Sequence, residues 1–245
     1  MHTAVHPAPV IDRTGFFANA TLLMAVLVLL SFPLTYYLPV VTGTQSFQLL
    51  YHVHGLASFA WIGLLAWQAQ LVAKGNIARH REIGLSGFAL SGALVLSGYW
   101  MAQRGGENRL AQGAAQPWEF TYFNLVDISL FALLVIGAIG LVTRHVDWHR
   151  RLMYIAALCL VAPALTRWTL KLPLANSLLV DLLSYVLVTI PFLIALGMHD
   201  RRVLGRIHAA TLTGTALLLP LQLSSPWIAR SAWWNGIAPT LLGSG

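Results

Sequence analysis

Long apolar stretches, separated by short polar and basic turns, follow one another along most of the chain. Seven of them are long enough, or nearly so, to cross a bilayer as a helix, which takes about 20 mostly apolar residues. They cover residues 16–38, 47–73, 83–102, 120–143, 151–170, 177–198 and 204–223. The pattern predicts an all-α integral membrane protein, with one transmembrane domain over residues 1–245 and about seven membrane-spanning helices.

Two segments outside these stretches have a different character. Residues 103–119 are rich in glycine and are expected to form a loop that could cover a site from outside the membrane. Residues 224–245 are too short and too interrupted to span. They contain Pro226, Pro239, Trp227, Trp233 and Trp234, which suits a segment lying in the headgroup zone.

Composition agrees with a membrane location. Hydrophobic residues make up 57% of the chain and charged residues 9%, and the mean hydropathy is +0.69. So few charges cannot cover a water-facing surface, which excludes a soluble enzyme, a disordered chain and a coiled coil. The single cysteine, Cys159, lies in an apolar stretch, so no disulfide framework or cysteine-based metal motif is expected.

The net charge of +7 reflects membrane topology rather than nucleic-acid binding, because the basic residues cluster between apolar stretches. With seven spans, the N-terminal side carries ten of the 15 basic residues: Arg13, Lys74, Arg79, Arg81, Arg144, Arg150, Arg151, Arg201, Arg202 and Arg206. The other five are Arg104, Arg109, Arg167, Lys171 and Arg230. The positive-inside rule therefore predicts a cytoplasmic N-terminus and a C-terminus on the opposite side.

Three of the basic turns resemble one another. Each places histidine and arginine at the expected cytoplasmic start of a helix, around His80, His149 and His208. This similarity is compatible with three duplicated hairpins plus one added helix. It is equally compatible with convergence, because positive-inside turns select the same residue types.

The residues in these turns, together with a histidine in the second predicted span, also resemble a group of known membrane proteins. The His54-Gly55 pair, His80-Arg81 with Gly84, and the run His-Arg-Arg-Leu-Met at 149–153 resemble a group of bacterial multi-pass membrane proteins without an assigned function. The resemblance implies a bacterial inner membrane, where the C-terminal side given by the positive-inside rule is the periplasm. A looser similarity to cytochrome b561-type proteins implies haem between helices, but the histidines here are not matched pairs well inside the spans.

Four of the ionisable residues inside the predicted spans stand out by their depth, because an ionisable group within the membrane costs about 2.5–3.5 kcal/mol on insertion scales. They are His54, Asp127, Arg167 and Asp181. Their positions along the spans put all four at a similar depth near the non-cytoplasmic side. We expect them to converge in one interhelical space, with Arg167 paired to Asp127 or Asp181.

This first set has two interpretations. In the first, the four are candidate catalytic residues that form a site for a proton, a quinone-type ring or a small anionic group. His54 would exchange a proton near neutral pH. Alternatively, they are ion pairs that only hold helices together.

The second set consists of His80, His149 and His208, at the cytoplasmic starts of three predicted helices. Three imidazoles that met there could bind haem b or a transition metal. The alternative is contact with lipid phosphates, because the same turns carry arginines and helix N-termini attract phosphate.

Together these patterns favour an inner-membrane redox protein that binds haem b or a metal through histidines and exchanges electrons or protons with a quinone-like partner. The absence of a large soluble segment suits a carrier acting between membrane redox partners. One alternative is a small proton-coupled transporter or channel with an intramembrane His/Asp/Arg site. Another is an accessory subunit of a larger membrane complex. The sequence contains no phosphate-binding glycine loop, zinc-protease motif or nucleophile elbow, so it leaves enzymatic activity open.

Overall fold

The computed structural model describes residues 15–173 and 177–242, and every regular element within them is helical. Arg13, one of the basic residues used for the topology prediction, lies outside the described residues. The elements are α1 (Phe16–Leu30), π-helical η1 (Pro33–Tyr37), α2 (Leu38–Thr42), α3 (Leu49–Ala73), α4 (Ile77–Ala111), α5 (Glu119–Leu141), α6 (Val146–Thr169), α7 (Ser177–Ser184), π-helical η2 (Tyr185–Thr189), α8 (Ile190–Leu204), α9 (Ala209–Ala229) and α10 (Ala232–Leu241). The protein is an all-α multi-pass membrane bundle, as predicted.

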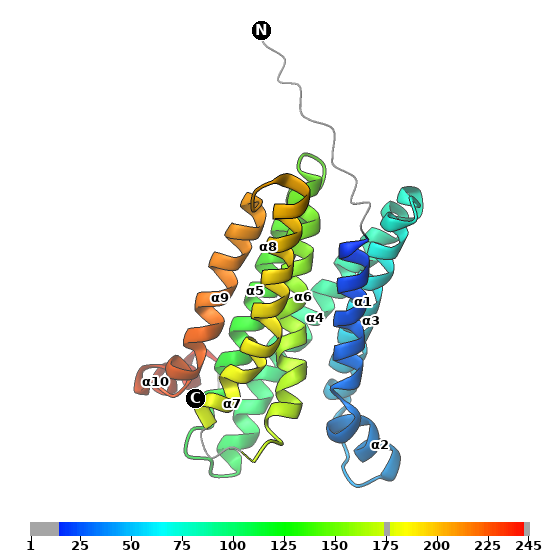
Figure 1. Ribbon diagram of the computed structural model, residues 1–245. Helices are drawn as coiled ribbons and strands as arrows, with labels where there is room; N and C mark the ends of the chain where they lie inside the picture. Colours follow the sequence, from blue (N-terminus) through cyan, green and yellow to red (C-terminus); the bar gives the residue numbers. More distant parts are fainter. Residues whose placement is uncertain (1–14, 174–176, 243–245) are drawn as a thin grey trace.

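The long helices run up and down in the order of the chain (Figure 1). α6 is the central element and packs against α1, α5, α7 and α9, while α4 lies between α3 and α5. One stretch of α6, from Tyr154 to Cys159, is almost fully buried. Buried aliphatic and aromatic side chains of the neighbouring helices surround this stretch, and their tight packing around α6 stabilises the bundle.

Among the described residues, six helical segments are long and apolar enough to cross a membrane: Phe16–Thr42, Leu49–Ala73, Ile77–Ala111, Glu119–Leu141, Val146–Thr169 and Leu178–Leu204. They match the first six predicted spans. The predicted seventh span, 204–223, corresponds to α9, which is 21 residues long and packs against α5 and α6. At 1.5 Å per residue α9 reaches across about 30 Å, although it is not among the six segments apolar enough to count as candidate spans.

The first span is not the continuous helix predicted over residues 16–38. α1 ends at Leu30, and the chain continues through a π-helical turn, in which the amide of Tyr37 donates to the carbonyl of Phe32 at 3.2 Å. Pro33 explains the interruption, because it has no amide hydrogen and its ring cannot follow a regular helix. The wider π turn carries Phe32 and Tyr36 into the wall of a cavity described below.

The predicted loop over residues 103–119 is mostly helical. α4 continues to Ala111, supported by an ion pair between Arg104 and Glu107 at 3.0 Å. Gly106 packs directly against the Trp118 ring, since a Cβ at this position would lie 2.2 Å from two of its ring carbons. Glycine here permits a close approach of helix and ring, a role that sequence alone could not separate from loop flexibility.

The predicted interfacial segment, 224–245, also differs from expectation. α9 continues through Pro226 to Ala229, and α10 follows beside the end of the bundle (Figure 1). Trp227 and Trp233 are exposed, which suits the headgroup zone. Trp234 is instead buried, and its indole nitrogen donates to the Trp118 carbonyl at 2.8 Å. Residues 243–245 lie outside the described residues.

Candidate functional site

A cavity of about 320 Å³ lies among α1, η1, α3, α4, α5 and α6. Its walls are mainly aliphatic and aromatic, and its polar side chains come from four elements, η1, α3, α5 and α6. The polar lining consists of Thr35, Tyr36, Tyr51, His54, Ser58, Asn124, Asp127 and Arg167. A largely apolar cavity with a few convergent polar groups is the usual form of a small-molecule site.

His54 has a defined hydrogen-bonding arrangement. Its Nδ1 lies 3.0 Å from the Ser97 hydroxyl, which itself donates to the Ala93 carbonyl at 2.7 Å. Since a hydroxyl has one hydrogen, the Ser97 oxygen accepts from His54 Nδ1–H. A neutral His54 therefore carries its lone pair on Nε2, where the ring can accept a proton.

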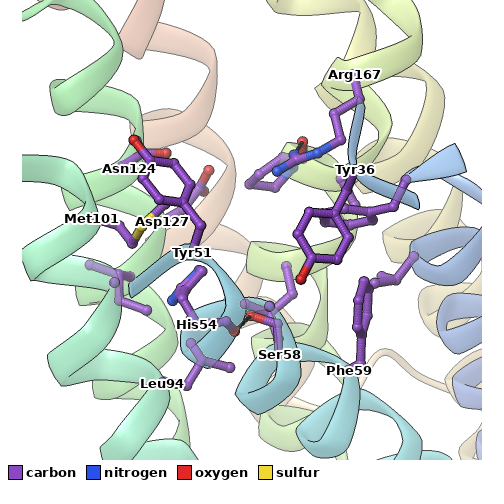
Figure 2. Close-up of a pocket in the computed structure, with 18 of the residues that line it drawn as sticks. Tyr36, Tyr51, His54, Ser58, Phe59, Leu94, Met101, Asn124, Asp127 and Arg167 are labelled. Atoms are coloured by element: carbon purple, nitrogen blue, oxygen red, sulfur yellow. Dashed lines mark hydrogen bonds between the residues drawn. The ribbon is translucent and has the colours of Figure 1, made fainter. Parts of the chain in front are cut away.

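Arg167 reaches toward the cavity from α6, from the side opposite Asn124 and Asp127 (Figure 2). Its Nη1 donates to the Pro163 carbonyl at 3.2 Å, and its guanidinium carbon lies 4.1 Å from the centre of the Phe32 ring. Within residues 15–173 and 177–242 no carboxylate forms an ion pair with it. The predicted pairing of Arg167 with Asp127 or Asp181 is therefore wrong.

Asp127 is instead held by neutral donors. Its Oδ1 accepts from Gln222 Nε2 at 2.8 Å, and Tyr185 also hydrogen-bonds to its carboxylate. Gln222 in turn accepts from the Thr189 hydroxyl at 2.9 Å. This buried hydrogen-bonded chain connects α5, α9 and η2, so Asp127 is retained in the bundle without a neighbouring cation.

Asp181 lies away from the cavity lining and forms an ion pair with Arg230. The same guanidinium nitrogen also contacts Glu119 at 2.6 Å. Arg230 follows α9 and lies outside the predicted spans, so depth alone could not identify it as the partner. The structure thus brings His54, Asp127 and Arg167 to one cavity and assigns Asp181 to a different polar cluster.

The second predicted set is also divided. The rings of His80 and His149 lie 6.5 Å apart between centroids. His208 is the residue before α9, where its Nδ1 accepts from the Ala210 amide at 3.0 Å and its ring contacts Trp148. Among the described residues no group of three His, Cys, Asp or Glu side chains is arranged to hold a metal ion. The expected three-histidine site is therefore not assembled.

Several uncharged polar residues contribute to the site, and prediction from the sequence missed them because it relied on ionisable side chains. Asn124 lines the cavity one helical turn before Asp127, and Ser97 orients His54. Gln222 reaches Asp127 from α9, the long helix that is not among the six apolar spans. In the sequence, each of these residues is an uncharged polar side chain within an apolar stretch. Such a residue indicates a functional site less strongly than an ionisable residue does, because it costs less to bury in the membrane.

Comparison with models of known protein families, with curated proteins and with solved structures finds no match. The functional interpretation therefore depends on the residues and geometry of the bundle.

Proposed function

We propose that the protein is a membrane redox protein that binds a quinone-type molecule in the cavity and exchanges protons with it during electron transfer. The observation that carries the proposal is the partly buried guanidinium of Arg167, which faces an apolar cavity shared with His54. A guanidinium has five N–H donors and no acceptor. A quinone ring with two carbonyl acceptors and an apolar body complements that arrangement.

The cavity walls support a ring-shaped ligand. Phe59 and Tyr36 present aromatic rings, and Asn124 and Tyr51 offer further hydrogen bonds to a carbonyl (Figure 2). Phe32 adds a third aromatic ring to the lining. The volume of about 320 Å³ falls at the small end of the range for ligand cavities, which suits a head group with a tail extending outward. Arg167 would bind one carbonyl and favour any negative charge that develops on its oxygen.

His54 would hold or move the proton. When a quinol loses two electrons it also releases two protons, and the lone pair on His54 Nε2 can accept one of them. Ser97 keeps Nδ1–H engaged, which fixes the tautomer needed for this step. Asp127, the carboxylate in the same lining, is a candidate for the second proton. The electrons would pass to or from a membrane redox partner.

Binding of a short-chain quinone to purified protein tests the proposal. Isothermal titration calorimetry in detergent should give saturable binding of decylubiquinone or a short menaquinone analogue to the unmodified chain. Arg167→Leu should weaken binding about tenfold to a hundredfold, which corresponds to a lost hydrogen bond from a charged donor. Arg104→Ala is the matched control, because this arginine is exposed and lies outside the cavity lining.

The result can be separated from misfolding. Asp127 and Asp181 have their own partners, so Arg167→Leu should leave both carboxylates compensated and the thermal stability close to that of the unmodified protein. His54→Phe should weaken quinol binding more than quinone binding, because only the quinol has an O–H to donate to Nε2. Absence of saturable binding, or equal binding by the Arg167→Leu variant, would contradict the proposal.

A small transporter is the second candidate, and the interrupted helices around the cavity favour it. Pro163 precedes Arg167 by one turn inside α6, η1 contributes to the lining, and η2 carries Tyr185, which binds Asp127. Interrupted helices are common at transporter binding sites. Flux of an anionic solute into proteoliposomes, abolished by Arg167→Leu and accompanied by no quinone binding, would favour this candidate.

A further inference from the structure

A pair of histidines lies at the end of the bundle where α4 and α6 begin, near the C-terminal end of α3. The rings of His80 and His149 make an edge-to-face contact, with centroids 6.5 Å apart and planes at 79°. They come from two successive helical hairpins, α3–α4 and α5–α6. The contact brings together two nitrogen-bearing rings that are far apart in the sequence.

The hydrogen bonds of His149 determine which of its nitrogens is free. Its Nδ1 lies 3.1 Å from the Ala138 carbonyl oxygen. A carbonyl oxygen only accepts, so Nδ1 carries the hydrogen and the neutral ring keeps its lone pair on Nε2. A backbone carbonyl that orients an imidazole in this way is the usual support of a metal-binding histidine.

His80 also has an available ring nitrogen. Its ring lies against the backbone of Gln68, and its Nδ1 is buried and has no hydrogen-bond partner in the part of the chain that the structure describes. A neutral imidazole that carries its hydrogen on Nε2 presents the lone pair of Nδ1. Each of the two rings thus has one nitrogen available as a ligand.

The side chain of Gln68 supplies an independent observation. It is 8% exposed, and neither Nε2 nor Oε1 has a hydrogen-bond partner among the described residues. Leaving a buried polar group unpaired costs about 1–3 kcal/mol. Buried polar atoms in folded proteins are almost always satisfied, so such a group indicates a bound ion or water. An amide oxygen is also a possible metal ligand.

We infer that His80 and His149, with the amide oxygen of Gln68, bind a single transition-metal ion at this end of the bundle. Two imidazoles that share one ion at about 2 Å from each nitrogen have ring centroids at most about 6 Å apart, so the two rings need to move together by about 0.5–1 Å from the observed 6.5 Å to bind it. Neutral imidazoles suit copper, zinc, nickel and iron, and copper heads the affinity order for nitrogen ligands. The site is separate from the cavity, whose lining contains none of the three residues.

Metal titration of the full-length protein tests the inference. Protein purified without a polyhistidine tag and treated with chelator should bind one Cu⁺ or Zn²⁺ ion per chain. His80→Ala and His149→Ala should each weaken binding at least tenfold, and Gln68→Leu should weaken it less. Co²⁺ provides a second measurement, because its visible absorption bands report the ligand field directly and are expected to change in all three variants.

Two control histidines make the test specific. His145→Ala removes an exposed imidazole at the same end of the bundle, and His208→Asn removes one that the sequence groups with His80 and His149. Both variants should bind the ion as tightly as the unmodified chain. The Arg167→Leu variant should also keep full metal occupancy, so failure of the quinone proposal and failure of the metal site give different results.

The inference is overturned if the unmodified protein binds no ion more tightly than the His80→Ala His149→Ala double variant. That outcome would show that only water satisfies these side chains. Equal losses in the His145→Ala or His208→Asn controls would also overturn it, because they would indicate adventitious binding by scattered histidines. A variant that fails to fold is recognised by its thermal melt, and Gln68→Leu then remains as the isosteric test.

Discussion

Arg151 and Asp200 form an ion pair in which neither side chain is exposed, with Nη2 of the arginine 2.5 Å from Oδ1 of the aspartate. The pair joins α6 to α8. The second carboxylate oxygen accepts from the Thr211 hydroxyl and from the His208 backbone amide, which also attaches the start of α9. Both charges are therefore well satisfied within the core.

Removing one partner should leave the other charge buried and unpaired. Asp200→Ala is expected to lower the free energy of unfolding by about 3–5 kcal/mol, measured by chemical denaturation in detergent micelles. Replacing both partners, as in Arg151→Met with Asp200→Leu, should cost less than Asp200→Ala alone. The exposed Arg202→Ala serves as control and should change stability by about 0.5 kcal/mol or less. A small effect of Asp200→Ala would contradict the importance of this pair.

Two adjacent glycines in α4 offer a matched comparison. A Cβ on Gly106 would lie 2.2 Å from the buried Trp118 ring, whereas a Cβ on Gly105 would meet nothing within 4 Å. Gly106→Ala should therefore destabilise the protein by about 1–3 kcal/mol through overpacking. Gly105→Ala should be neutral or stabilising by up to about 1 kcal/mol, because alanine favours the helix. Thermal melts of the two variants distinguish these outcomes, and equal melting temperatures would disprove the packing role of Gly106.

His208 should make stability depend on pH. Burial, and then the positive charge of Arg151, lowers the pKa of His208 below its ordinary value of about 6.5. The unfolded chain therefore binds a proton more readily than the folded chain. This contribution to the free energy of unfolding is fully present above about pH 6.5 and decreases as the pH falls through that value.

His208→Asn isolates this effect, because asparagine retains a helix-capping oxygen and does not titrate. Denaturation at pH 8 should give similar stabilities for the variant and the unmodified protein. At pH 5.5 the unmodified protein should lose more stability than the variant. Parallel pH profiles would show that His208 contributes nothing to the dependence.

The topology can be tested with reporter fusions. The ten-to-five distribution of basic residues predicts that the turn between α3 and α4 lies in the cytoplasm and that the end of α10 lies in the periplasm. Alkaline phosphatase fused after Leu241 should therefore be active, and the same enzyme inserted after Gly75 should be inactive. Inactive phosphatase at Leu241 would mean that α9 does not cross the membrane.

The positions of most helices could be predicted because lipid selects apolar side chains directly. The stretches at 47–73 and 120–143 agree with α3 and α5 to within two residues at either end. Prediction failed where a helix depends on particular neighbours. α4 extends past its apolar stretch because Gly106 packs against Trp118, and the first span is interrupted by Pro33.

The candidate site was only partly predictable for a related reason. The cost of an ionisable group in lipid indicates that His54, Asp127 and Arg167 face the protein interior, and their positions along the helices indicate a common depth. Depth does not specify the direction in which each side chain points around its helix. Gln222 and Arg230, which bind the two aspartates, therefore could not be identified from spacing.

The bond between Gln222 and Asp127 also bears on how the protein is made. α9 is the long helix that is not among the six apolar spans, and in lipid its glutamine amide would have to be satisfied some other way. Asp127 and Thr189, the two partners of that amide, precede it in the chain. We therefore expect α9 to enter the bilayer stably only after both partners have emerged from the ribosome, so that its insertion follows the assembly of the helices already in place.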